Sequence, residues 1–397
     1  MKKNKWTCAA IPALLLHCSI GTVYCWSLLK DEIGIYMGRS TSSVEWAFSI
    51  AIFCLGMSAA FGGQIVEKNI KKSSLIAAIF FSLGLVGTGL AISAKSLIGV
   101  YLSYGVIMGI GLGIGYLSPV KTLMLWFSDN KGLGTGLAVA GFGLAKVIAS
   151  PIIAVLNEKV GIINLFYVLA AIYFIMMMCG HFLLEKPADW KEDHHNSSFK
   201  VSEILRNPVF IGIWIVFYIN VTAGLALISQ EKGIMLAIGM PLATIALMAS
   251  ITAIFNASGR IGFSTLSDKF KDRNKIYQII LLSAILSIAV VVFTHGIVNR
   301  IFFEIIILLC VINATYGGGF SCLPTLLADR FGMKNISAIH GLALSAWAFA
   351  GLTGNQLSSY IISQTGSYEM VLNVVLILLI IALIIDLFVV GHKKRTV

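Results

Sequence analysis

Three basic residues lie inside long apolar stretches of this 397-residue sequence: Lys121, Lys146 and Arg260. A charge near the centre of a bilayer costs roughly 2.5–3.5 kcal/mol on insertion scales, so such a residue faces a water-filled cavity or a partner. The sequence places no acidic residue in the middle third of any of these stretches. The residues therefore predict a central cavity with a net positive charge, which suits an anionic substrate.

Arg260 is the strongest candidate for binding that anion. Its planar guanidinium can hold a carboxylate through two parallel hydrogen bonds. The side chain leans toward the N-terminus of its helix, and hence back toward the middle of the bilayer. Asn256 lies one turn earlier on the same face. The alternative is a structural arginine that caps carbonyl groups of a neighbouring helix.

The two lysines are further candidates for substrate binding. Lys146 lies in the middle of an apolar stretch, with Phe142 one turn earlier on the same face, and either faces the cavity or is satisfied by carbonyl groups of other helices. Lys121 is only eight residues from Asp129, so it can also extend its ammonium group to the cytoplasmic interface.

Aromatic residues form a second class of candidates for the wall of a pocket. Tyr24, Tyr116, Tyr316 and Trp347 all lie inside apolar stretches. Each of them is also compatible with simple packing or with anchoring at the membrane interface.

The composition shows which elements must position these residues. The mean hydropathy is +0.90, and only 12% of the residues are charged, against about 25% in a soluble domain. Backbone in hydrocarbon needs internal hydrogen bonds, and unbroken runs of about 20 apolar residues select helices rather than a barrel. The sequence therefore predicts an all-α membrane protein. We expect twelve transmembrane helices, at 6–28, 44–65, 74–93, 98–126, 133–156, 163–184, 209–229, 241–266, 276–295, 301–327, 337–362 and 370–391.

The placement of charge predicts the orientation. With both ends in the cytoplasm, 20 of the 29 basic residues fall on inner segments and six on outer loops. This asymmetry predicts a multi-pass protein of the cell inner (plasma) membrane with both termini cytoplasmic. The net charge of +11 is then a topology signal and not a nucleic-acid-binding patch.

A polar stretch divides the chain into two similar halves. We expect a six-helix bundle at 1–185, a cytoplasmic linker at 186–208 and a second six-helix bundle at 209–397. Glu67 and Asp268 occupy similar loops 201 residues apart. A second pair of matching loops has nearly the same offset, which indicates duplication with parallel topology and two pseudo-symmetric bundles.

Those loops resemble degenerate copies of the Gly-x-x-x-Asp-Arg-x-Gly-Arg-Arg signature of the major facilitator superfamily. Glu67-Lys68 replaces Asp-Arg in the first copy, and Asp268-Lys269 with Arg273 fits the second. The resemblance implies the major facilitator fold, with these five residues in gating loops.

The chain more specifically resembles the oxalate/formate antiporter family. The matching stretches include Gly21-Thr22-Val23-Tyr24-Cys25-Trp26-Ser27-Leu28, Lys131-Gly132-Leu133 and Ser258-Gly259-Arg260. The resemblance implies that Arg260 contacts a substrate carboxylate. It also implies that aromatic residues on spans 1, 4, 5 and 10 wall the pocket, and these correspond to Tyr24, Tyr116, Phe142 and Tyr316.

One departure from that family limits the substrate. Its oxalate-exchanging members pair the span-8 arginine with a lysine on span 11, whereas this chain offers only His340 there. We therefore expect a small monocarboxylate such as formate, pyruvate or lactate, moved by exchange, proton symport or uniport. We expect a monomer in the lipid bilayer, with no cofactor and no nucleic-acid partner.

The sequence also bears on three other functions. A proton-driven exporter of cationic molecules needs a buried carboxylate in the first half, and none lies mid-span. An enzyme needs clustered histidines and a glutamate, or a nucleophile with its base, and the histidines within the spans are isolated. A non-transporting nutrient sensor on the same fold remains an alternative.

Overall fold

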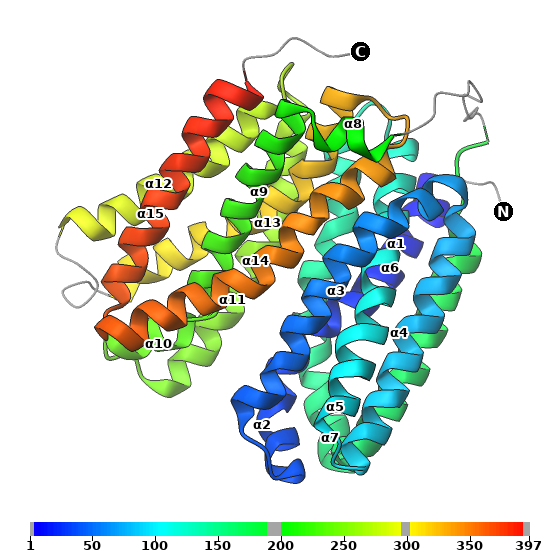
Figure 1. Ribbon diagram of the computed structural model, residues 1–397, viewed down its shortest axis with the longest axis vertical. Helices are drawn as coiled ribbons and strands as arrows, with labels where there is room; N and C mark the ends of the chain where they lie inside the picture. The colour runs from blue at the N-terminus through cyan, green and yellow to red at the C-terminus, as the bar shows by residue number, and fades with distance from the viewer. Residues whose placement is uncertain (1–3, 189–199, 295–301, 392–397) are drawn as a thin grey trace. The chain divides into compact units, whose positions relative to one another are not determined.

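The computed structural model describes residues 4–188, 200–294 and 302–391, and these residues form helices and turns without a strand (Figure 1). Residues 189–199 of the predicted linker lie outside the described part. The elements before the linker are η1 (Trp6–Ala10), α1 (Ile11–Ile20), η2 (Gly21–Cys25), α2 (Trp26–Met37), α3 (Thr41–Lys68), α4 (Ile70–Ser93), α5 (Leu97–Val100), η3 (Tyr101–Met108), α6 (Gly109–Trp126) and α7 (Lys131–Leu183).

The second part of the chain is also helical. Its elements are α8 (Val201–Leu205), α9 (Pro208–Ile228), α10 (Glu231–Ala237), α11 (Leu242–Ser267), α12 (Asn274–Thr294), α13 (Phe302–Phe331), α14 (Ile336–Thr365), α15 (Tyr368–Ile385) and η4 (Asp386–Val390).

The predicted spans correspond to these helices. Ten helices of the described chain are long and apolar enough to cross a membrane. One of them, α7, covers both 133–156 and 163–184, and the backbone leaves helical geometry between these two spans at Gly161, where φ is 76°. Helix α11 corresponds to the predicted span 241–266. The prediction of an all-α membrane protein is confirmed, with ten candidate spans in the described residues.

Polar residues mark where several helices begin. The side chain of Ser40 accepts a hydrogen bond from Ser43 N, and that of Asn69 accepts one from Lys72 N. Such a cap satisfies one of the amides that the first helical turn leaves without a partner. Ser96, Asn207 and Ser367 cap α5, α9 and α15 in the same way.

The chain divides into two compact units. The first contains residues 1–194 with 334–348, and the second contains 195–333 with 349–397. The first turns of α14 therefore pack with the N-terminal helices, and the rest of α14 packs with the second unit. The sequence-based boundary at 186–208 stays a prediction.

The first span changes geometry where it meets α7. Residues Gly21–Cys25 form a 3₁₀ segment between α1 and α2. A Cβ atom on Gly21 would lie 2.5 Å from the carbonyl oxygen of Phe142. Only glycine permits this approach, which places Tyr24 beside Phe142.

Helices α11 and α13 make a similarly close contact in the second unit. A Cβ on Gly259 would lie 2.1 Å from the carbonyl oxygen of Ala314, and one on Gly317 would lie 2.2 Å from that of Asn256. These glycines let the two backbones touch, which brings Arg260 against α13.

Candidate functional site

Three aromatic rings meet inside the first unit. Tyr116 on α6, Phe142 on α7 and Trp347 on α14 are each at most 1% exposed. Their ring centroids lie 5.7–5.8 Å apart in edge-to-face pairs, which is the favoured geometry for aromatic contacts. Tyr24 on η2 adds a fourth ring, 5.5 Å from Phe142. The structure therefore brings together all four aromatic candidates of this unit.

His17 lies directly behind this cluster and is fully buried. Its ring stacks on Tyr116, with centroids 5.1 Å apart. Nε2 faces the carbonyl oxygen of Tyr116 at 3.0 Å, and Nδ1 makes a short contact with that of Ala138. Sequence reasoning treated His17 as an isolated histidine. Its partners are 99 and 121 residues away, so no local pattern could reveal them.

Lys146 lies one turn beyond Phe142 on the same face of α7. Its side chain is exposed, and its carbonyl oxygen accepts a hydrogen bond of 2.5 Å from Ser150. The exposed aliphatic residues Ile148 and Val155, each 52% exposed, lie on roughly the opposite side of the helix. The side that carries Ile148 and Val155 suits contact with lipid. Because Lys146 lies on the opposite side, it points away from the proposed lipid contact.

Lys121 is engaged in a salt bridge. Its Nζ lies 2.6 Å from Oε1 of Glu67, and the lysine side chain is 6% exposed. The second oxygen of Glu67 accepts a hydrogen bond of 3.0 Å from the backbone N–H of Ser337, in the first turn of α14. Glu67 thus connects α3, α6 and the positive N-terminal end of α14. Lys68, the next residue, is exposed at the end of α3.

Arg260 belongs to a second cluster, in the second unit. It is 2% exposed, and its Nε donates a hydrogen bond of 2.9 Å to Oδ1 of Asn256. The guanidinium carbon lies 5.4 Å from the ring centroid of Phe320, and Tyr316 contacts that ring at 5.1 Å. A cation held over an aromatic ring is stabilised by the charge distribution of the ring.

One polar residue of α13 extends this face and binds an acid of α10. Asn313, one turn before Tyr316, donates a hydrogen bond of 3.1 Å to Glu231 on α10 and another of 3.0 Å to Leu309 O. Sequence reasoning did not single out Glu231, because it lies in no recognisable motif.

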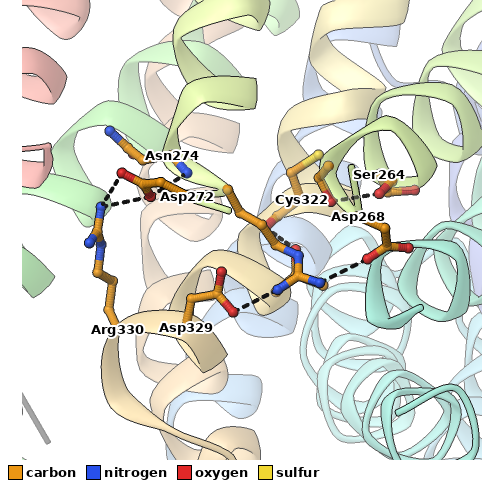
Figure 2. A network of polar contacts seen from close by, with 10 residues as sticks. Ser264, Asp268, Asp272, Asn274, Cys322, Asp329 and Arg330 are labelled. Carbon is orange, nitrogen blue, oxygen red and sulfur yellow. Dashed lines mark hydrogen bonds and ion pairs between the residues drawn. The ribbon is translucent and has the colours of Figure 1, made fainter. Parts of the chain in front are cut away.

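Charged residues at the ends of α11, α12 and α13 form a network (Figure 2). Arg273 binds Asp268 at 2.9 Å and Asp329 at 2.7 Å. Burial lowers the pKa of Arg273, but the hydrogen bonds and charges of both carboxylates outweigh it and raise the pKa above its ordinary value. Lys269, the neighbouring residue in the loop, is exposed.

A second pair extends the network toward α15. Arg330 lies 3.1 Å from Asp272, and the side chain of Asn274 donates a hydrogen bond of 2.9 Å to the buried Asp386 in the last span. These contacts hold loop and helix ends together. In the described residues, no cluster of three or more His, Cys, Asp or Glu side chains could hold a metal ion.

A family model and several known proteins match this chain. The model of the Major Facilitator Superfamily matches residues 13–355. An uncharacterized MFS-type transporter of Escherichia coli K12, YhjX, is 24% identical over 347 residues, covering 86% of this chain and 84% of that protein. The oxalate:formate antiporter of Oxalobacter formigenes is 25% identical over 369 residues, covering 91% and 86%. Human monocarboxylate transporter 12 is 27% identical over 191 residues, covering 48% and 36%.

Solved structures share the fold. A bacterial homologue of the iron transporter ferroportin superposes with a TM-score of 0.75 at 13% identity, covering 96% of this chain and 98% of that one. The proton:xylose symporter XylE gives 0.74 at 13% identity, covering 96% and 94%.

Proposed function

The chain belongs to the Major Facilitator Superfamily, and from this premise we propose that it carries small monocarboxylates, such as formate, pyruvate or lactate, by alternating access. The family and its solved structural neighbours named above are transporters and not enzymes, and this chain is a multi-span membrane protein. We further propose that it acts as a monomer in the inner (plasma) membrane with both termini cytoplasmic.

The buried arginine of the second unit carries this proposal. Arg260 lies inside a membrane-spanning helix, where a permanent positive charge is costly unless it has a function or a partner. Asn256 holds Nε and thereby fixes the plane of the guanidinium, and Phe320 supports one face. A fixed, planar set of donors matches the two oxygens of a carboxylate.

The first unit has an apolar wall and a cation of its own. Tyr24, Tyr116, Phe142 and Trp347 form an apolar surface suited to the short carbon chain of a monocarboxylate. Lys146, one turn from Phe142 and directed away from the exposed aliphatic side of α7, supplies positive charge at the edge of that surface. Anions are drawn toward such a charge over several ångströms.

The sequence favours one negative charge on the substrate over two. Span 11 contains no lysine. The one basic residue between Lys334 and Glu369 is His340, which is 2% exposed. The names of two relatives, the oxalate:formate antiporter and monocarboxylate transporter 12, support the carboxylate class.

The test is counterflow in proteoliposomes. Vesicles with purified protein are loaded in turn with formate, pyruvate, lactate, oxalate or a neutral sugar, and uptake of the labelled compound is measured. We expect uptake with a monocarboxylate and weaker competition by oxalate. Uptake that oxalate blocks better than every monocarboxylate would refute the selectivity. Binding without flux would identify a sensor, and flux of an uncharged or cationic compound would identify an exporter of another kind.

A further inference from the structure

The hydrogen-bonding partners of His17 indicate whether its imidazole ring is protonated. Both ring nitrogens face carbonyl oxygens, which can only accept hydrogen bonds: Nε2 faces Tyr116 O and Nδ1 faces Ala138 O. A neutral imidazole has one N–H donor and one acceptor nitrogen, whereas the imidazolium has two donors. Only the protonated ring satisfies both contacts at once.

The surroundings of His17 favour a stored proton. The ring is 0% exposed, yet two charge-assisted hydrogen bonds and the stacked ring of Tyr116 stabilise its positive charge. The titratable or charged groups around it are Tyr116 on α6, Cys18 on α1, His340 on α14 and, farther along α7, Lys146. Lys146 and His340 can only add positive charge, which helps the proton to leave again.

His340 lacks the same support. Its Nε2 is buried and has no hydrogen-bond partner among the described residues. Protonation would therefore give this ring a second N–H donor without any acceptor to bind it. Of the two histidines that flank the ring of Tyr116, the geometry selects His17 as the one that holds a proton.

We propose that His17 binds the proton that this carrier moves together with its monocarboxylate. The proposal rests on the function proposed above and adds a second substrate. On one side of the membrane a ring nitrogen takes a proton from water, forming an N–H bond without any electron transfer, and on the other side the same bond breaks and returns the proton to water. One anion and one proton move together, so the cycle transfers no net charge.

The position of His17 explains how proton and substrate are coupled. The ring stacks on Tyr116 and lies 6.2 Å from the ring of Phe142, so its charge is one side chain away from the proposed substrate wall. Loss of the proton turns one donor into a lone pair that faces a carbonyl oxygen. Either α6 or α7 must then lose its hydrogen bond to α1, and the ring it carries can shift.

The experiment uses proteoliposomes with a pH dye trapped inside. In wild type we expect an inward gradient of the counterflow substrate to acidify the lumen, with about one proton for each anion. His17→Gln keeps an N–H donor but cannot titrate. We expect it to retain counterflow within about threefold, while substrate-driven acidification falls at least about tenfold. His181→Gln is the matched control, because His181 binds Ser74 at the far end of α7, and it should behave as wild type.

Each outcome decides the proposal. Acidification by His17→Gln at the wild-type rate would overturn it. If His17→Gln does not fold, the wild type still decides: net uptake of the anion down its gradient without any proton movement would reject proton coupling while leaving the monocarboxylate function intact. A wild type without counterflow of any carboxylate would reject both. A flat pH dependence of net uptake in wild type between pH 5.5 and 8 would also contradict a titrating group.

Discussion

At the scale of single residues, two buried cations have different surroundings. Arg260 is held by a neutral amide and an aromatic face, whereas Lys121 faces a carboxylate 2.6 Å away. The proposal that Arg260 binds the substrate rests on this oriented guanidinium, whereas the salt bridge gives Lys121 a contact that joins α6 to α3.

Two substitutions of Arg260 should distinguish the contribution of its positive charge to anion binding from that of its planar shape. Arg260→Lys keeps the charge but loses the two-pronged grip, so transport should fall strongly. Arg260→Gln should weaken anion binding by tens to thousands of times, since loss of a charged hydrogen-bonding partner costs roughly 2–5 kcal/mol. Binding is measured by calorimetry in detergent. Arg39→Gln, in an exposed turn, is the control. A well-folded Arg260→Gln protein with wild-type affinity would place the anchor elsewhere, with Lys146 next.

The salt bridge of Lys121 should appear as coupling energy. We expect Lys121→Met and Glu67→Gln each to lower thermal stability, because each leaves a largely buried partner without its contact. The double variant should be less destabilised than the sum of the two, by about 0.5–3 kcal/mol. Strict additivity in a double-mutant cycle would show that the two residues act independently.

At the scale of elements, glycines decide which helices touch. The contact between α11 and α13 depends on Gly259 and Gly317, and the contact of η2 with α7 depends on Gly21. In both places a candidate binding residue sits beside the glycine: Arg260 in the first case and Tyr24 in the second. Close packing thus fixes the binding groups as well as the helices.

A methyl group at Gly317 should disturb the Arg260 site. The new Cβ would lie 2.2 Å from Asn256 O and 3.0 Å from Cγ of Arg260, so the helices must separate. We expect Gly317→Ala to lower stability by about 1–3 kcal/mol and to weaken substrate binding. Gly262→Ala is the matched control, since nothing lies within 4 Å of its added Cβ. Equal effects of both substitutions on melting temperature would contradict the packing argument.

The Arg273 network should stabilise the helix ends of the second unit. Arg273→Gln removes charge-assisted bonds to Asp268 and Asp329, and we expect a loss of roughly 1.5–3 kcal/mol for each bond that is not replaced. The raised pKa of Arg273 means that its contribution is complete below its ordinary pKa and is lost only as the pH rises through the still higher folded value. The destabilisation by Arg273→Gln in thermal melts should therefore be the same at pH 7 and pH 9.

At the scale of the whole molecule, the sequence predicts the spans well and the side-chain partners poorly. Apolar runs of membrane-spanning length are local, so even the pair merged into α7 was separated correctly around Gly161. Partners are not local: Lys121 is 54 residues from Glu67, and Ser337 is 270 residues from it. No periodicity connects such positions. The 3₁₀ segment at Gly21–Cys25 was likewise missed, because its cause is contact with α7.

The orientation can be tested with single cysteines. In a variant without its native cysteines, we expect a thiol at Glu203, before α9, to react with an impermeant maleimide only after the cells are opened. A thiol at Lys95, in the turn after α4, should react in intact cells. Both positions are exposed. Labelling of Glu203→Cys from outside would reverse the proposed topology.

The bond between Asn274 and Asp386 has a consequence for the order of synthesis. The two residues are 112 positions apart, and Asp386 lies in the last described helical segment at 1% exposure. The ribosome therefore completes Asn274 well before the carboxylate that it binds. The last helix therefore enters the membrane with an acid whose hydrogen-bonding partner has already been synthesised. If that early partner is lost, as in Asn274→Leu, the defect should appear first as slow or failed integration of the final helix, and a quality-control protease should remove the chain before any transport assay could detect it.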